Sequence, residues 1–341
     1  MRDAVLISDT HPLTRVNKGD QEGQVGERFA VNCNADTFLP AAHETLTDEA
    51  TDLLRHSLAP ATERALRGDL THFQDWGGSL PATPATVCAY IGDHAGHHAV
   101  ATIQRRVASI SKAHEMAALP NPVRAEIVKA TLRGLRRKHG TAQRQAKPLM
   151  RDELLLVLDS LGETLRDQRD RALLLLGFAG GFRRSELVAL ERADIETVRQ
   201  GLIVTIRRSK VDQEGAGRRI GIPHGRTRHC PVAAVEAWLS ASAIDTGPLF
   251  RPITRHGHVA ANPLTGDAVS VLLRERLAAA GIDPEGYSGH SLRAGFATSA
   301  AQAGVSTLKI RAMTGHATDA MLARYVREGE LFTGNAAGVL L

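Results

Sequence analysis

Two pairs of charged side chains in the second half of the sequence have the spacing of one helix face. Arg183 and Glu186 are three residues apart, so a helix would bring the carboxylate beside the guanidinium. His290 and Arg293 have the same spacing. A guanidinium can bind a phosphate through two hydrogen bonds, and an imidazole can move a proton near neutral pH. Taken alone, either pair is also common as a surface pair.

A third motif follows these pairs and ends at a tyrosine. The tripeptide Thr314-Gly315-His316 comes after Arg293, and Tyr325 lies nine residues beyond His316. The chain contains only three tyrosines. A phenol can act as a nucleophile in covalent catalysis when a neighbouring base accepts its proton. Phosphoryl transfer is therefore the chemistry that this ordered set of arginine, histidine and tyrosine favours.

The ordered set resembles the signature of tyrosine recombinases and integrases. That signature is Arg-x-x-Glu-Leu, a lysine in a hairpin, His-x-x-Arg, Gly-His and a tyrosine nine positions later. The likeness is closest to the Cre-type site-specific recombinases and runs from about residue 46 to the end. His316 is a departure, because Cre has tryptophan there, although histidine is the commoner form in the family. Further similar residues are Thr102 to Gln104, Arg136 to Lys138, Ala303 to Ser306, and Thr333-Gly334.

The resemblance implies a site-specific DNA recombinase, a DNA strand transferase that acts through a 3′-phosphotyrosine and a Holliday junction without metal or ATP. Tyr325 is then the expected nucleophile. Arg183 and Arg293 would neutralise the charge that grows on the phosphate in the transition state. His290 would accept or relay the phenol proton, and His316 would donate a hydrogen bond to a phosphate oxygen.

Lys210 and Glu186 complete the expected site. Lys210 follows the first of two β-branched runs, and we expect it to protonate the leaving 5′-oxygen, because arginine is too weak an acid for this task. Glu186 is expected to hold the geometry of Arg183 or of His290. Tyr287 lies off the pattern and is interpreted as a partly buried aromatic residue.

Composition and periodicity predict two domains, mostly α-helical with a small β-sheet. Helices are expected to open at Pro60, at Pro84 and at Asn121-Pro122, and strands at 202–208 and 218–222. The resemblance implies a SAM-like helical core-binding domain and an α/β catalytic domain that form a C-shaped DNA clamp. The expected segments are a disordered arm at 1–45, a helical core DNA-binding domain at 46–140, a linker at 141–148, a catalytic domain at 149–331 and a tail at 332–341.

The charge distribution favours a polyanionic partner. The chain has 42 Lys+Arg against 37 Asp+Glu, a net charge of +5, and no acidic residue occurs from Ile127 to Arg151. A solvated helix face usually mixes its signs, so this stretch predicts a segment that faces phosphate. Arg207-Arg208 and Arg218-Arg219 would either touch phosphate or keep a hairpin soluble. The candidate DNA contacts are Arg64, Thr102, Arg105, Arg106, Arg136, Arg137 and Lys138.

By the resemblance, the partner is double-stranded DNA with inverted-repeat half-sites, bound by a homotetramer on two sites. The apolar tail at 332–341 is expected to dock in trans on the next protomer.

Other kinds of site have little support in the sequence. The three cysteines are widely spaced and are interpreted as reduced thiols of a cytoplasmic protein, nucleoid-associated when bound to DNA. His94, His97 and His98 have no cysteine or acidic partner at a metal-binding spacing, so neither a metal nor a cofactor is expected. The longest apolar run is too short to cross a membrane.

Three alternatives share parts of the pattern. A type IB topoisomerase would use the same chemistry, but the Cre-like helical domain and the short tail after Tyr325 argue against it. A non-catalytic DNA-binding descendant would not need an intact set of six site residues. A phage integrase with an arm-binding domain would need more structure than the first 45 residues predict.

Overall fold

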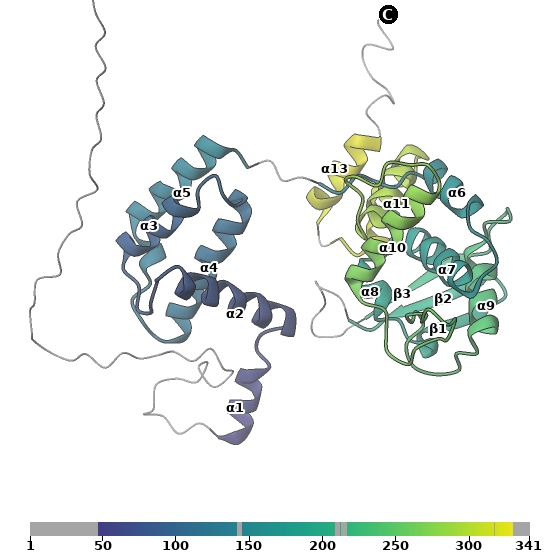
Figure 1. Cartoon of the computed structure of the whole chain (residues 1–341), viewed down its shortest axis with the longest axis horizontal. Coiled ribbons are helices and arrows are strands. Elements are labelled where there is room, and N and C mark those ends of the chain that lie inside the picture. The colour runs from purple at the N-terminus through teal and green to yellow at the C-terminus, as the bar shows by residue number, and fades with distance from the viewer. Residues whose placement is uncertain (1–46, 142–144, 209–211, 213–216, 317, 330–341) are drawn as a thin grey trace, which may run out of the picture. The chain divides into compact units, whose positions relative to one another are not determined.

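The computed structural model of the chain describes residues 47–141, 145–208, 212, 217–316 and 318–329. The chain divides into two compact units, Met1–Ala142 and Gln143–Leu341 (Figure 1).

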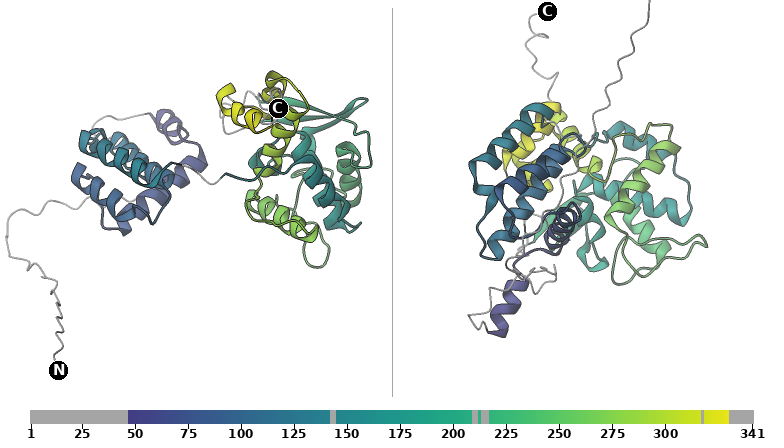
Figure 2. Two further views of the ribbon diagram at one scale, coloured as in Figure 1. Left: turned by 90° about the horizontal axis from the view of Figure 1, so that it is seen from above. Right: turned by 60° about the vertical axis from the view of Figure 1, so that its left-hand side comes forward.

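The described part of the N-terminal unit is a helical bundle (Figure 2). Pro60 and Pro84 occupy first helical positions, where a missing N–H costs no hydrogen bond. Thr83 caps the second of these helices by accepting a hydrogen bond from the backbone N–H of Thr86 at 3.1 Å. Phe73 and other apolar residues fill the core between the helices. The helices are α1 (Asp48–Arg55), α2 (Pro60–Asp75), α3 (Pro84–His94), α4 (Val100–Met116) and α5 (Glu126–His139).

One predicted helix start is wrong. Asn121 and Pro122 open only a 3-10 turn, Pro122–Arg124, in which Asn121 Oδ1 accepts a hydrogen bond from the backbone N–H of Val123 at 3.0 Å. Ala125 is extended, with φ −66° and ψ 141°. Asn121 and Pro122 therefore begin a separate 3-10 turn, and α5 begins only at Glu126.

The described part of the C-terminal unit consists of helices around a three-stranded antiparallel sheet, which confirms the expected mostly helical fold class with a small sheet. The strand order is β1-β2-β3. Its elements are α6 (Arg151–Asp159), α7 (Leu165–Ala179), α8 (Arg184–Val188), a 3-10 turn (Arg192–Asp194), β1 (Ile195–Val198), β2 (Gly201–Ile206), β3 (Arg218–Pro223), α9 (Pro231–Ser242), α10 (Gly266–Ala279), α11 (Ser291–Gln302), α12 (Thr307–Thr314) and α13 (Asp319–Gly329).

The first strand was missed by the sequence analysis. Strand β1 is only four residues long, and its two central residues, Glu196 and Thr197, are exposed. It therefore lacks the apolar alternation by which a strand is recognised in a sequence. Its place is fixed instead by pairing with β2, where Ile195 lies opposite Val204.

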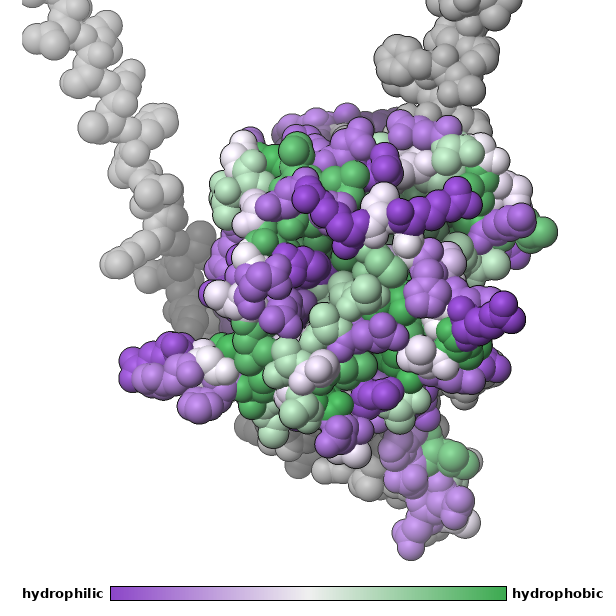
Figure 3. All heavy atoms as spheres, turned by 90° about the vertical axis from the view of Figure 1, so that its right-hand side faces the viewer, coloured by the Kyte–Doolittle hydropathy of each residue, from purple (hydrophilic) through white to green (hydrophobic). Residues whose placement is uncertain are grey.

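The core of the C-terminal unit lies between the sheet and helices α7, α9 and α10. Trp238 is fully buried there, and its indole N–H donates to the carbonyl of Leu249 at 2.9 Å. On the face drawn in Figure 3, polar residues are spread among the apolar ones. Within the described residues, no helix combines the length and the apolar character needed to span a bilayer.

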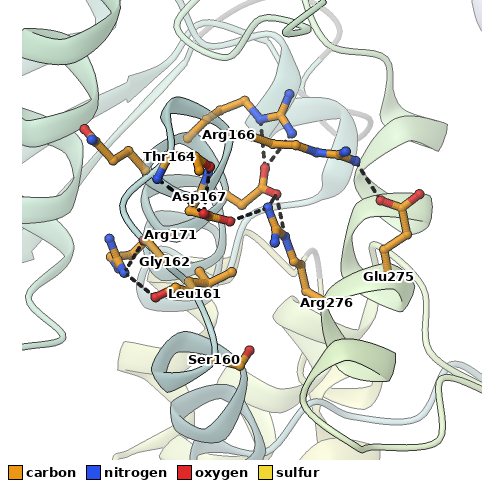
Figure 4. Close-up of polar contacts among 12 residues, drawn as sticks. Ser160, Leu161, Gly162, Thr164, Arg166, Asp167, Arg171, Glu275 and Arg276 are labelled. Atoms are coloured by element: carbon orange, nitrogen blue, oxygen red, sulfur yellow. Dashed lines mark hydrogen bonds and ion pairs between the residues drawn. The ribbon is translucent and has the colours of Figure 1, made fainter. Parts of the chain in front are cut away.

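A buried network of ion pairs joins α7 to α10 (Figure 4). Asp170 is 0% exposed, and its two oxygens accept from Arg169 Nη2 at 2.6 Å and from Arg276 Nη2 at 2.6 Å. Arg276 Nη2 also lies 2.8 Å from Asp167 Oδ1. Two guanidiniums thus face two carboxylates, which balances the charge of this cluster.

Candidate active site

Arg183 and Glu186 meet at the start of α8. Arg183 is the N-cap residue rather than a helical residue. Its backbone N–H donates to Glu186 Oε2 at 3.0 Å, and its Nη1 donates to Glu186 Oε1 at 2.6 Å. Its Nη2 donates to the carbonyl of Gly315 at 2.9 Å. The guanidinium is therefore held from two sides, between α8 and the end of α12.

A second guanidinium, that of Arg218 at the start of β3, shares the same carboxylate. Arg218 Nη2 donates to Glu186 Oε2 at 2.8 Å. Burial by itself would raise the pKa of Glu186, but the backbone N–H of Arg183 and the guanidinium of Arg218 lower it below its usual value. Glu186 is thus ionised. It makes no hydrogen bond to His290 in the part of the chain that is described.

The sequence analysis left the role of Arg218 open, although the strand period distinguishes it from Arg219. Arg218 shares a face of β3 with the buried residues Ile220 and Ile222, whereas Arg219 points to the other face. Arg219 pairs there with Glu196, at 2.7 Å, and both side chains are exposed. The alternation of buried residues was therefore the signal that could have singled out Arg218.

Gly315 makes room for this arrangement. Its φ is +64°, a left-handed conformation that glycine adopts without strain. A Cβ at this position would lie 2.6 Å from Arg218 Nη1. The glycine of the Gly-His motif therefore both ends α12 and lets Arg218 approach the site.

Arg293, on α11, is 1% exposed. Its Nη1 donates to the carbonyl of Gly181 at 2.9 Å and to that of Thr314. Its Nη2 is buried and has no hydrogen-bond partner within the described ranges. Burial, followed by the charge of Arg183, lowers the pKa of Arg293 to about 10, so it remains a cation at neutral pH.

His290 and Tyr325 form a direct pair. Tyr325 lies on α13, which packs against α11, and it is 4% exposed. His290 Nε2 lies 2.9 Å from the Tyr325 hydroxyl oxygen. Burial, followed by the charges of Arg293 and Arg324, lowers the pKa of His290, so the ring is neutral near pH 7. A neutral ring with its proton on Nδ1 can accept the phenol hydrogen at Nε2.

His316 also contacts Tyr325, and the centroids of the two rings lie 5.7 Å apart. The Thr314 hydroxyl donates to the carbonyl of Ile310 at 2.7 Å, so His316 Nδ1, 2.8 Å away, must donate to that hydroxyl. Burial, followed by the charge of Arg293, lowers the pKa of His316 to about 3. Its Nε2 therefore carries no proton in this arrangement, and donation from Nε2 requires proton uptake, which an adjacent anion favours.

Arg324 is a contact that the sequence analysis did not anticipate. Its Nη2 donates to the Tyr325 hydroxyl at 3.3 Å, and its guanidinium carbon lies 5.0 Å from the centre of the Tyr325 ring. Its Nε is buried, and no described residue accepts a hydrogen bond from it. No spacing rule singles out a residue adjacent to the tyrosine, so the sequence offered no signal for it.

Tyr287 lies outside this group of residues. It is buried, and its hydroxyl donates to Glu153 Oε1 at 2.7 Å. Burial, followed by this hydrogen bond, raises the pKa of Tyr287, which makes it a poor nucleophile. Its surroundings are those of a structural residue.

Several expected residues lie elsewhere or outside the described chain. Lys210, the arm at 1–45 and the tail at 332–341 are outside the described residues. In the N-terminal unit, Arg105 Nη1 pairs with the buried Asp69 Oδ2 at 2.7 Å, so this cation already has a partner within its own unit. The remaining candidates for DNA contact are half-buried, as Thr102 and Arg106 are, or exposed, as are Arg64, Arg136, Arg137 and Lys138.

The described site has an excess of positive charge. Among the described residues, the guanidiniums of Arg183 and Arg218 pair with Glu186, and the charge of Arg293 adds to theirs, so three cations stand against one carboxylate. The buried Arg218 Nε and Arg293 Nη2 have no hydrogen-bond partner among the residues that the structure describes. Buried polar groups are rarely left unpaired, so free donors beside excess positive charge mark a site for an anion. The His290–Tyr325 pair borders this site.

Comparison with known proteins shows the family to which this chain belongs. The model of the phage integrase family matches residues 147–330. An integrase/recombinase xerD homolog of Selenomonas ruminantium is 38% identical over 304 residues, which cover 86% of this chain and 89% of the relative. The recombinase cre of Escherichia phage P1 is 28% identical over 276 residues, which cover 75% of this chain and 79% of the relative. The chain therefore belongs to the phage integrase family of tyrosine recombinases, and its class of activity is site-specific DNA recombination.

Solved structures show the same fold at low sequence identity. The site-specific recombinase XerH bound to a palindromic difH substrate matches with a TM-score of 0.58 and 18% identity, over 86% of this chain and 82% of that one. A lambda integrase dimer bound to a COC′ core site matches with a TM-score of 0.58 and 17% identity, over 82% of this chain and 93% of that one.

Proposed function

We propose that this protein cleaves and rejoins DNA strands at a specific site through a 3′-phosphotyrosine on Tyr325, and that it exchanges strands through a Holliday junction. The observation that carries the proposal is the distance of 2.9 Å between His290 Nε2 and the Tyr325 hydroxyl oxygen, beside buried guanidiniums with free donors. A nucleophile paired with a base next to an anion site is the arrangement that phosphoryl transfer requires.

In the first step, the Tyr325 oxygen attacks the scissile phosphorus while His290 Nε2 accepts the phenol proton. The lowered pKa of His290 supports this role, because a neutral imidazole can accept a proton at pH 7 whereas an imidazolium cannot. A bond forms between the tyrosine oxygen and phosphorus, and the bond from phosphorus to the 5′-oxygen breaks. The reverse step restores the phosphodiester.

The guanidiniums of Arg183 and Arg293 bind the non-bridging oxygens of the phosphate. Arg183 is held by Glu186 and Gly315, and Arg293 by two backbone carbonyls, so little reorganisation is needed when charge develops. Arg293 Nη2 is free to donate. His316 joins them as a hydrogen-bond donor once the phosphate favours its protonation.

Lys210 supplies a proton to the leaving 5′-oxygen in this proposal. A lysine ammonium has a pKa near about 10.4 that neighbouring cations can lower, whereas arginine remains protonated. The step then needs no cofactor. The phosphotyrosine is an ester like the phosphodiester it replaces, so the strand can be resealed without ATP.

Cleavage occurs in cis in this proposal, because one chain supplies every described group. Helix α13, which carries Tyr325, packs on α11 of the same chain, and Tyr325 belongs to a small apolar core with Ala297 and Leu322. Mixing Tyr325→Phe protein with Arg183→Ala protein on a full site, where two protomers lie side by side, should therefore restore no cleavage, whereas restored cleavage would show that the tyrosine acts in trans.

The partner is duplex DNA with inverted-repeat half-sites, and the assembly is a homotetramer on two sites. A lambda integrase tetramer bound to a Holliday junction has a related fold, with a TM-score of 0.58. The exposed cations Arg136, Arg137 and Lys138 at the end of α5 suit contacts with DNA phosphates. The DNA clamp and the docking of the tail in trans remain predictions.

A nicked suicide substrate tests the nucleophile. Tyr325→Phe protein should bind the DNA normally but form no covalent adduct, because only the hydroxyl oxygen is removed. The matched control is Tyr287→Phe, which removes another buried hydroxyl and should leave adduct formation intact. An adduct that persists in Tyr325→Phe protein and maps to another residue would refute the proposal.

A further inference from the structure

Three histidines of the N-terminal unit converge although they come from different elements. His72 lies in the last turn of α2, His94 is the last residue of α3, and His98 precedes α4. One ring nitrogen from each lies within 4.8 Å of those of the other two, and all three side chains are half-buried. The expectation of no metal rests on His94, His97 and His98, and it leaves out His72, which is distant in sequence.

Hydrogen bonds on the outer side of two rings orient them. His94 Nδ1 lies 2.8 Å from the carbonyl oxygen of Tyr90. A carbonyl can only accept, so Nδ1 carries the proton and the lone pair is on Nε2. His72 Nδ1 lies 2.9 Å from the Tyr90 hydroxyl. Histidines that bind metal commonly hold their second nitrogen in such a hydrogen bond, which fixes the tautomer and the ring orientation.

We propose that His72, His94 and His98 bind one divalent first-row transition-metal ion of the zinc type, with a fourth position left for water. Neutral imidazoles suit such ions. Zinc-to-nitrogen bonds of about 2.0–2.1 Å imply nitrogens about 3.4 Å apart in a tetrahedral site. The ring nitrogens now lie within 4.8 Å of one another, so binding requires the side chains to rotate and bring these nitrogens closer together.

The charges near the cluster act in two directions. The guanidinium of Arg106 places a positive charge near His72 and His98, and this charge repels a cation. Asp69 offsets part of it, because its buried carboxylate lies 4.0 Å from Arg106 Nε.

An ion at this position would join the end of α2, the end of α3 and the start of α4. Helix α4 carries Thr102 and Arg105, two of the residues expected to contact DNA. The ion would therefore fix the helix that is expected to face DNA relative to its neighbours. None of the three histidines takes part in the proposed chemistry of Tyr325. A negative result for metal binding would therefore leave the proposed recombination untouched, and the reverse also holds.

Metal binding by the full-length chain without an affinity tag tests the proposal. Chelator-treated protein should bind one equivalent of Co²⁺ with visible d–d absorption, and Zn²⁺ should displace it. Zn²⁺ should also raise the melting temperature, because the ion binds the folded form. His94→Phe, which keeps an aromatic ring stacked on that of His98, should abolish the absorption and the rise in melting temperature.

His97→Phe is the matched control, because His97 lies in the same turn but is exposed. It should bind Co²⁺ like the unmodified chain. His72→Gln and His98→Gln should each lose the signal while circular dichroism shows that the fold is retained. The proposal is overturned if the unmodified chain gives no saturable Co²⁺ signal, or if the signal survives all three ligand substitutions, which would place the ion elsewhere.

Discussion

Two clusters of arginines in the C-terminal unit differ in how their charge is balanced. Between α7 and α10, Arg169 and Arg276 face the carboxylates of Asp167 and Asp170. In the described part of the candidate active site, Arg183 and Arg218 pair with the carboxylate of Glu186, and Arg293 adds a third guanidinium that is bonded to backbone carbonyls. Both clusters are buried and rich in arginine, so neither burial nor arginine content identifies the site.

The balance of charge and of hydrogen bonds separates the two clusters. A cluster in which each cation has an anion holds elements together and has no need of a ligand. A cluster with excess positive charge and unpaired donors, such as Arg293 Nη2, lowers stability until an anion binds. This difference leads to opposite expectations for substitutions in the two clusters.

Arg293→Met should give the largest loss of activity. The substitution removes a donor to the phosphate, and loss of one such donor costs about a hundred- to a thousand-fold in rate. It also removes a buried cation with an unpaired Nη2, which offsets the loss of the hydrogen bonds to Gly181 and Thr314, so the free energy of unfolding should change little. Single-turnover cleavage and urea unfolding measure the two effects. A large loss of stability with unchanged cleavage would reverse the assignment.

Asp170→Asn should have the opposite profile. Breaking a buried ion pair by removing one partner costs about 3–5 kcal/mol, and here two guanidiniums lose a charged acceptor. Urea unfolding should show this loss, whereas the cleavage rate of the protein that remains folded should stay near that of the unmodified chain. A stable Asp170→Asn protein would show that the network does not hold α7 to α10.

Arg218→Met and Arg219→Met form a matched pair on adjacent positions of β3. Arg218 contacts Glu186, so the Arg218→Met substitution should leave Arg183 less firmly held. Cleavage should slow by about ten- to a hundred-fold, which is less than the loss expected when a direct donor to the phosphate is removed. Arg219 makes only an exposed ion pair, worth about 0–1 kcal/mol, and its loss should leave cleavage nearly unchanged. Equal effects of the two substitutions would remove Arg218 from the site.

The pH dependence of cleavage should follow His290. Its pKa is lowered from the ordinary 6.5, so the neutral base is fully present at pH 7 and is lost as pH falls through the lowered value. Single-turnover cleavage by the unmodified chain should therefore be flat near neutral pH and fall in acid. In His290→Asn protein the rate should be low and should lose this acid limb. An acid limb that persists unchanged would assign the titration to another group.

The sequence predicted those parts of the molecule that depend on local spacing. Arg183, His290, Arg293, His316 and Tyr325 were chosen by their order and intervals. The structure brings their side chains together around one position, which leaves their catalytic roles for experiment. The first turns of α2 and α3 follow from proline at the first helical position. The helix starts are signalled by single residues, whereas the site is signalled by short motifs in a fixed order along the chain.

The features that sequence analysis missed depend on contacts between distant residues. Strand β1 is defined by its pairing with β2, and Arg276 meets Asp170 across 106 positions of the chain. His72 joins His94 and His98 only because α2 and α3 end near the start of α4. No local pattern contains such contacts, so the three-dimensional fold was needed to find them.

The most direct test of the central claim is cleavage of a substrate with a methylphosphonate at the scissile position. This group replaces a charged non-bridging oxygen with a neutral methyl group, so a guanidinium that neutralises the phosphate is no longer required. Arg293→Ala protein should be strongly impaired on normal DNA and should cleave the methylphosphonate substrate nearly as fast as the unmodified chain does. Equal impairment on both substrates would contradict the claim that the excess positive charge of the site serves the phosphate.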